Sequence, residues 1–129
     1  MNASGGKTGG GDVTVYRGNV TEADWEAADL TIDDAYHDLD LSSVVPVGTT
    51  HVQMVVQGLS ADITMAFQLK EKDSTNAVVA RNMNIRVTVK PYMRETWLAV
   101  NADRIVEYNS TVGTWLMLRL TVTAWKVPA

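Results

Sequence analysis

Hydrophobic and polar residues alternate along much of the chain after residue 36, and a two-residue period is typical of strands that bury one face. The clearest example is the segment MNIRVTV at 83–89, and the segment ITMAFQL at 63–69 shows the same pattern. Because glycine and proline both weaken a strand ladder, we expect Gly58 and Pro91 to end strands. Further strands are predicted over 13–17, 36–41, 51–57, 96–100, 104–108 and 114–126.

These segments make about eight strands at spacings of roughly ten residues, with little helix between them. Parallel units need crossover helices, which the pattern does not contain. One sheet cannot bury its apolar face alone, so either two antiparallel sheets must stack or one sheet must close on itself. We therefore predict an all-β, antiparallel β-sandwich of the jelly-roll type, forming a single domain over 12–129. An immunoglobulin-like sandwich is the alternative, although its usual Cys–Trp–Cys frame is missing.

A sharp corner is predicted after residue 41. In the stretch DLSSVVPVGTTHVQMVVQG, Pro46 fixes a backbone dihedral and Gly48 permits a positive φ. Ser42 and Ser43 lack the G-x-S-x-G pattern of a hydrolase nucleophile, so we interpret them as the turn that ends the preceding strand. The corner is expected to carry the chain from one sheet to the other.

The first residues carry different signals. Residues 1–11 are rich in glycine and are predicted to form a flexible arm, because they offer almost no apolar area to bury. The GGKT within them lacks the earlier glycine, the strand and the helix of a phosphate-binding loop. Near 21–28 the β pattern stops, and one or two helical turns capped by Thr21 are expected there. An acidic loop pinned by Trp25 is the alternative.

Composition excludes several kinds of function. The chain has 129 residues, a net charge of −4 and no cysteine. It therefore has neither disulfides nor cysteine-ligated metal centres. The negative net charge disfavours nucleic acid and anionic membranes as partners. No apolar segment approaches the ~20 residues of a membrane span, and the first residues have no apolar core, so a secretory signal is not expected.

Candidate catalytic or metal-binding groups are few. The segment from Asp29 to Asp40 is rich in aspartate, whose oxygens suit Ca²⁺. It lacks the glycine and terminal glutamate of a helix–loop–helix calcium site, so the favoured interpretation is a solvated loop whose aspartates cap turns. The two histidines, His37 and His51, would form an acid–base pair only if the fold brought them together. We predict no cofactor, no metal and no catalytic residue.

Large side chains late in the chain are candidate interface residues. If the leucines of the last strand face the core, then Trp115, Met117 and Trp125 face outward. Such groups in water are unfavourable by about 25 cal/mol per Å², so they indicate either a covering layer from the N-terminal segment or a subunit interface. Tyr92 and Trp97 lie beside Pro91 in an expected exposed aromatic loop. They too must either pack within the chain or contact another subunit. These five residues are the predicted subunit or capsid contacts.

Three pieces of the chain, spread over about 36–126, carry a resemblance. They are the turn and corner DLSSVVPVG, the strand RIVEYNS and the closing strand LTVTAWKV. The chain resembles small β-sandwich structural proteins of tailed bacteriophages, in which an Asp–Leu–Ser turn precedes VP-G and a valine-rich strand. In those proteins an IEY-like strand comes later, and the last strand finishes on an aromatic residue. The matching residues are Asp40, Leu41, Ser42, Pro46, Gly48, Ile105, Glu107, Tyr108 and Trp125, with Val106 inserted.

The resemblance implies a virion component without catalysis. The interpretation that we prefer is a capsid decoration, or cement, protein, made in the host cytoplasm and placed on the capsid surface. It would act as a homotrimer and brace the major capsid protein. The alternative is a tail fibre or appendage domain that binds a host-surface receptor or glycan. A chain little longer than one domain, with a Gly-rich arm, suits the cement role better. The segment before Tyr36 and the loop from Tyr92 to Trp97 depart from the pattern of these proteins.

Overall fold

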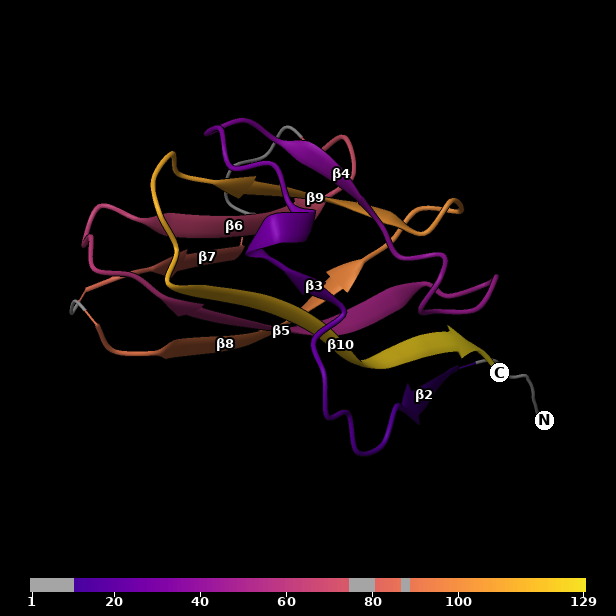
Figure 1. Cartoon of the computed structure of the whole chain (residues 1–129). Coiled ribbons are helices and arrows are strands. Elements are labelled where there is room, and N and C mark those ends of the chain that lie inside the picture. The colour runs from indigo at the N-terminus through magenta and orange to yellow at the C-terminus, as the bar shows by residue number, and fades with distance from the viewer. Residues whose placement is uncertain (1–10, 75–80, 87–88) are drawn as a thin grey trace.

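The computed structural model of the chain describes residues 11–74, 81–86 and 89–129, and it consists of two antiparallel sheets packed face to face (Figure 1). The first sheet has the order β2-β10-β5-β8, with the short β3 also paired to β10. Its strands are β2 (Asp12–Tyr16), β3 (Trp25–Glu26), β5 (His51–Leu59), β8 (Tyr92–Ala99) and β10 (Met117–Pro128). The second sheet has the order β4-β9-β6-β7. Its strands are β4 (His37–Asp40), β6 (Ala66–Glu71), β7 (Arg81–Asn84) and β9 (Ile105–Ser110).

The strand pairs are nested along the chain. β2 pairs with β10, β4 with β9, β5 with β8 and β6 with β7, and every pair is antiparallel. The first strand therefore pairs with the last, and the pairing continues inward to the middle of the chain. This is one long hairpin rolled into two sheets, which is the jelly-roll arrangement. The predicted fold class is confirmed.

The alternation seen in the sequence places one face of each sheet in the core. Along β5 the residues Val52, Met54 and Val56 are buried, while the alternate residues Gln53, Val55 and Gln57 are half-buried on the outer face. The core between the sheets is filled by aliphatic, methionine and aromatic side chains. Among its fully buried members are Leu41, Met54, Met65, Phe67, Leu69, Leu98, Leu118 and Leu120.

The predicted corner connects β4 to β5 and so joins the two sheets. The backbone N–H of Val44 donates to the carbonyl of Leu41 at 2.9 Å. The N–H of Thr49 donates to the carbonyl of Pro46 at 3.3 Å, and Gly48 has a φ of 93°. A position with this positive φ suits glycine, since a residue with a Cβ meets a steric penalty in that conformation. The expectation of a corner between sheets is confirmed.

Several strand boundaries differ from the prediction. Of the described residues in the segment 83–89, only Met83 and Asn84 belong to a strand, because β7 ends at Asn84, and Val89 has a φ of 56°, which is not an extended conformation. Strand β6 begins at Ala66 and not at Ile63.

Gly58 does not end β5, which continues to Leu59. It faces the core, where a Cβ at Gly58 would lie 2.9 Å from the indole of Trp115 and would overlap the Met83 side chain. The glycine therefore makes room for two large side chains. The segment beginning at Tyr92, expected to be a loop, is strand β8, because its backbone pairs with β5 from Gly58 onward.

The segment between β2 and β4 also differs from the prediction. In place of a helix over 21–28, the chain forms the two-residue strand β3 and a short 3-10 helix, η1 (Ala27–Asp29). Trp25 is part of β3, and its backbone pairs with Leu120 of the last strand. Pairing with β10 thus overrides the weak helical pattern. The predicted flexible arm, apart from Gly11, lies outside the described residues.

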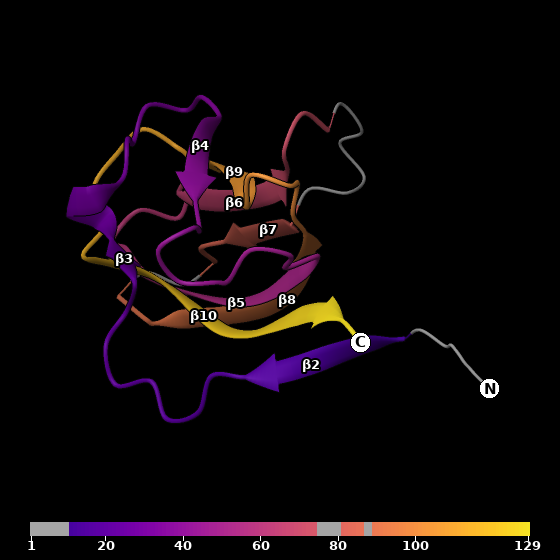
Figure 2. The same ribbon diagram turned by 90° about the vertical axis from the view of Figure 1, so that its right-hand side faces the viewer.

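Both ends of the described chain lie at one end of the sandwich (Figures 1 and 2). The N–H of Ala129 donates to the carbonyl of Gly11 at 3.0 Å. The corner between β4 and β5 lies at this same end, since Thr50 donates its N–H to the carbonyl of Lys126 at 2.9 Å. The loops β5–β6, β7–β8 and β9–β10 lie at the opposite end, on the left of Figure 1.

We predict that Gly58→Ala lowers the free energy of unfolding by about 1–3 kcal/mol, because an added methyl overpacks the core at this position. Chemical denaturation monitored by tryptophan fluorescence measures the change. Gly11→Ala is the matched control, since a Cβ at Gly11 meets nothing within 4 Å. Equal stability of the Gly58 variant and the parent would contradict the close packing of Trp115 and Met83 over this glycine.

Candidate functional site

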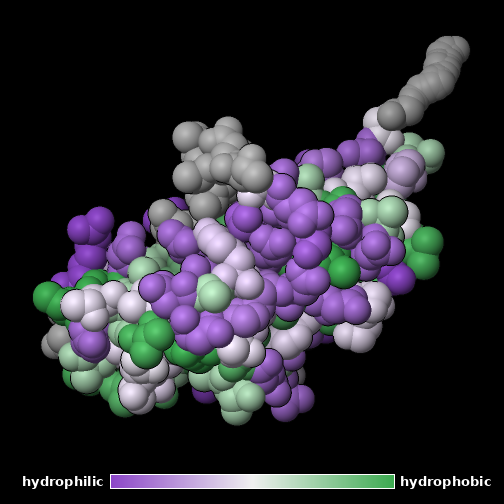
Figure 3. Space-filling view, turned by 90° about the horizontal axis from the view of Figure 1, so that it is seen from above, coloured by the Kyte–Doolittle hydropathy of each residue, from purple (hydrophilic) through white to green (hydrophobic). Residues whose placement is uncertain are grey.

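The end of the sandwich opposite the termini presents four large aliphatic side chains to solvent. They come from three loops, and we call them the loop tip. Their exposed fractions lie between 56% and 64%. Figure 3 shows hydrophobic residues gathered at the left end of the molecule, which is the end of these loops. The residues of the loop tip are Ile63, Val89, Val112 and Leu116.

Ser60, which is fully buried, ties the three loops of the tip together. Its hydroxyl donates to the carbonyl of Thr114 at 3.0 Å and accepts the N–H of Asp62 at 3.1 Å. Its carbonyl accepts the N–H of Val89 at 2.9 Å. Buried polar groups that are fully bonded fix a local arrangement, because breaking one bond leaves its partner unsatisfied. The loop tip is therefore a surface held in place by the fold.

Trp115 does not face outward as expected. It is 9% exposed, belongs to the core, and donates its indole N–H to the Ser110 hydroxyl at 2.8 Å. The reason is that β10 begins only at Met117, so residue 115 lies in a loop where the two-residue alternation does not apply. Leu116, expected in the core, is exposed instead and forms part of the loop tip.

Trp125 also departs from the predicted face. Between Val122 and Ala124 the register of β10 against β5 shifts, which is a β-bulge. After the shift Trp125 lies opposite Val52, which is buried, so its indole packs against the core and is half-buried. A bulge reverses the alternation without any change in the hydrophobic pattern, and the sequence therefore predicted the wrong face.

The other three predicted contacts are half-buried and lie apart from one another. Tyr92 packs against the core, and its hydroxyl accepts the N–H of Arg86 at 3.2 Å. Trp97 lies opposite Gln53 on the outer face of the first sheet, with the Lys126 ammonium 4.8 Å from its ring centroid. Met117 pairs with Leu59 near the loop tip. The five residues do not form one surface.

The two histidines do not share a site. His37 lies on β4 and contacts Asp33 at 2.7 Å, whereas His51 lies on β5 in the other sheet. The contact with His37 is the main reason why the pKa of Asp33 is lowered. Asp40 accepts the N–H of Ser42 at 2.9 Å, in the turn assigned to the two serines. Within the described part of the chain, no three acidic or histidine side chains are grouped as a metal site requires.

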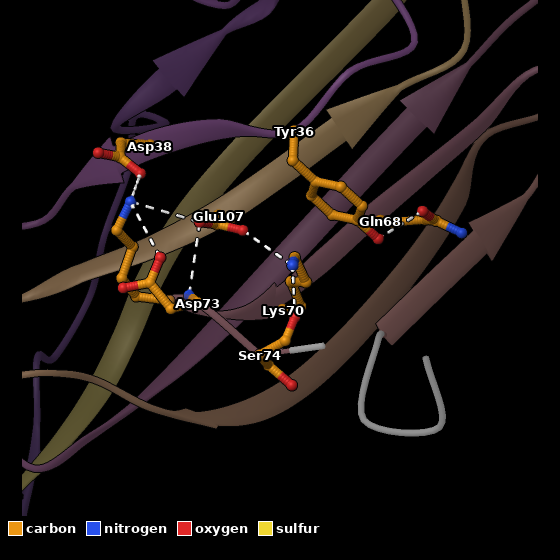
Figure 4. A network of polar contacts seen from close by, with 8 residues as sticks. Tyr36, Asp38, Gln68, Lys70, Asp73, Ser74 and Glu107 are labelled. Atoms are coloured by element: carbon orange, nitrogen blue, oxygen red, sulfur yellow. Dashed lines mark hydrogen bonds and ion pairs between the residues drawn. The ribbon is translucent and has the colours of Figure 1, made fainter. Parts of the chain in front are cut away.

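A network of charged residues crosses the outer face of the second sheet (Figure 4). Glu107 on β9 is 9% exposed and lies between Asp38 on β4 and Lys70 on β6. Its carboxylate contacts the ammonium of Lys70 at 3.0 Å and that of Lys72 at 3.4 Å. Lys72 also contacts Asp38 at 2.6 Å, and Lys70 lies 4.4 Å from the ring centroid of Tyr36. The network therefore links three strands of the sheet.

The pKa values show which protonation states this network favours. Burial alone would raise the pKa of Glu107, but hydrogen bonds from Lys70, the backbone of Asp73 and Lys72 outweigh burial and lower it. The hydrogen bond to Asp38 is the main cause that raises the pKa of Lys72 to about 12. Glu107 is thus ionised at neutral pH and bonded on both oxygens. This arrangement suits a structural ion pair better than a general acid.

A polar groove of about 440 Å³ lies on the outer face of the first sheet. Gln57, Arg119 and Thr121 line it from the sheet, and the loop from Val20 to Ala23 lines it from the side. That loop leaves the sheet between β2 and β3, and an ion pair closes its base: the Arg17 guanidinium contacts both oxygens of Asp24 at 2.6 and 2.9 Å. The groove offers mainly hydrogen-bonding groups and a smaller apolar area.

Sequence reasoning missed both the loop tip and the groove. Ile63 was expected on a buried strand face, yet it lies in a turn before β6. Val112 lies in the turn-forming stretch STVGT. An isolated apolar residue within such a stretch was the one signal that could have identified this part of the loop tip. The groove depends on the interruption between β2 and β3. The sequence signals this interruption, because the β pattern stops near 21–28, but it does not show that the loop lies beside the outer face of the sheet.

We predict that Glu107→Gln lowers the free energy of unfolding at neutral pH by about 1–3 kcal/mol, since two ammonium groups lose their shared charged partner. The folded-state pKa of Glu107 is lowered from 4.5, so its stabilising effect is present above pH 4.5 and is lost as pH falls through the folded-state pKa. The difference in stability between parent and variant should therefore shrink below pH 4.5. Urea denaturation from neutral to acidic pH measures it, and a pH-independent difference would contradict the assigned charge state.

Comparisons of the chain with protein-family models, with curated proteins and with solved structures find no match. Among the described residues, no helix has the length and apolar character needed to cross a membrane.

Proposed function

We propose that this chain is a non-catalytic structural protein of a bacteriophage virion, and specifically a capsid decoration protein. It would bind the outer surface of the head and stabilise neighbouring major capsid subunits. The proposal rests on the sequence resemblance to phage β-sandwich proteins and on one structural observation, the loop tip. A rigid apolar end, placed opposite both termini, suits attachment to a protein surface.

The physics of the loop tip supports attachment to a repeating partner. Burial of its four aliphatic side chains contributes about 25 cal/mol per Å² of apolar surface removed from water. The tip is small, so a single contact of this kind is weak. A shell offers many equivalent sites, and linked copies bind them with an avidity that exceeds each separate affinity. Weak apolar contacts therefore suffice for this role.

The polar groups of the described residues support a role without catalysis. Glu107, the buried carboxylate, is held by two ammonium groups. The two histidines lie in different sheets. Neither arrangement supplies a poised acid–base pair or an activated nucleophile. Binding by surface contact requires none of these groups.

We predict that the double variant Ile63→Ser and Leu116→Ser lowers occupancy on phage heads about tenfold, which corresponds to about 1.4 kcal/mol of lost binding. Both residues are exposed in the described structure, at 61% and 56%, so the fold should be retained. Cryo-electron microscopy of heads incubated with each purified protein measures occupancy, and circular dichroism checks the fold.

Val47→Ser is the matched control for this experiment. Val47 is 80% exposed and lies in the corner at the end that carries the termini. Its replacement removes apolar area without touching the loop tip, so occupancy should not change. Equal binding by the parent and the double variant would reject the tip as the attachment surface. Density confined to the tail would reject the decoration role.

The polar groove favours a second candidate, a tail fibre or appendage domain that binds a host-surface glycan. Gln57, Arg119 and Thr121 present donors and acceptors of the kind that sugar hydroxyl groups require. In that case Arg119→Ala should lower binding to host-cell polysaccharide about tenfold, which corresponds to about 1.4 kcal/mol. Isothermal titration with purified polysaccharide measures this, and absence of binding by the parent chain would exclude the second candidate.

A further inference from the structure

The free edge of β2 is the feature that carries a further inference. In the described structure β2 pairs with β10 on one side and ends the first sheet on the other (Figure 2). The N–H of Arg17 donates to the carbonyl of Thr123, and the N–H of Ala129 donates to the carbonyl of Gly11. In an antiparallel ladder, bonded residues alternate along a strand. Odd-numbered residues of β2 therefore bond β10, while the backbone groups of the even-numbered residues point away from it.

The side chains of β2 differ from those on two other edge strands, β8 and β4. On β8 the exposed residues include Arg94 and Glu95, and on β4 they include two aspartates. Charged residues on an edge hinder pairing with another chain. From residue 13 to residue 16, β2 reads VTVY, with Val13 46% and Tyr16 74% exposed. Apart from the exposed Asp12 at its start, β2 carries no charge, and it contains no proline. Its residue types favour strand pairing.

We propose that β2 pairs with β2 of a second copy of this chain, antiparallel and centred on Thr14, to form a two-fold dimer. In this register each Thr14 bonds the other through its N–H and carbonyl. The outward groups of Asp12 meet those of the partner's Tyr16. The first sheets of the two copies then continue into one sheet. This inference concerns self-association and does not depend on the proposed attachment to a capsid.

The side chains also match in this register. Val13 of one copy lies opposite Val15 of the other on one face of the joined sheet. On the opposite face Thr14 meets Thr14, and Tyr16 meets Asp12. Pairs of β-branched residues and threonine pairs directly opposite one another stabilise antiparallel strands. A strand whose sequence matches itself in this way fits a second copy better than it fits an unrelated extended segment.

The first experiment compares the mass of the full-length parent and of two variants at Thr14 by sedimentation equilibrium. Within one copy Thr14 lies opposite Lys126, so Thr14→Glu gains an opposite charge across the strand pair. In the dimer the same substitution places two glutamates directly opposite each other, which is unfavourable. The parent and Thr14→Val should therefore have twice the chain mass of 14.1 kDa, and Thr14→Glu should have the chain mass.

The second experiment tests the register by cross-linking. The natural chain contains no cysteine, so an introduced one has no other partner within its own copy. Bonded residues that lie opposite each other have Cα atoms about 5.5 Å apart, which a disulfide can bridge. Mild oxidation of Thr14→Cys should therefore give a covalent dimer on a non-reducing gel. Tyr16→Cys, whose partner in this register is Asp12, should remain largely uncross-linked.

Four results would overturn the pairing. They are a monomeric parent up to its solubility limit, a dimer that survives Thr14→Glu, equal cross-linking of the two cysteine variants, and a parent mass of three chains. The last result would support the homotrimer implied by the resemblance. Circular dichroism of each variant confirms that a change in mass does not arise from unfolding.

Discussion

The structure depends on the position of β10, the last strand, between the first strand and β5. The backbone of β10 bonds β2 and β3 on one side and β5 on the other, and its inward side chains from Leu118 to Ala124 fill the centre of the core. Every other strand of the first sheet is held to the body through β10 or through β5. Because the nested pairs join residues far apart in sequence, the chain has a high contact order, and folds of this kind form slowly.

Much of the architecture could be predicted from the sequence, since strand alternation and turn chemistry are local properties. The alternation at Val52, Met54 and Val56 gave the buried face of β5, and Pro46 with Gly48 gave the corner. The absence of crossover helices implied antiparallel sheets. These signals require no knowledge of the partner strand, which explains why the fold class followed from them.

The candidate surfaces could not be predicted in the same way, because they depend on pairing between distant segments. The bulge that turns Trp125 toward the core exists only in the register of β10 against β5. The late start of β10 places Trp115 inside and Leu116 outside. Likewise, the loop tip unites Ile63 with residues that are distant in sequence and become neighbours only when three loops meet at Ser60. A single alternation pattern contains none of this information.

The charged side chains on β8 set a limit on the size of any assembly built by strand pairing. If a sheet is extended at β2, both outer ends of the enlarged sheet are formed by β8, which presents Arg94 and Glu95. Another molecule that approached such an end in a two-fold register centred on Arg94 or Glu95 would bring like charges together, and charged residues on an edge hinder pairing in general, which opposes further addition. Growth by strand pairing would therefore stop at a closed particle of two subunits, and polymerisation into fibrils would be suppressed.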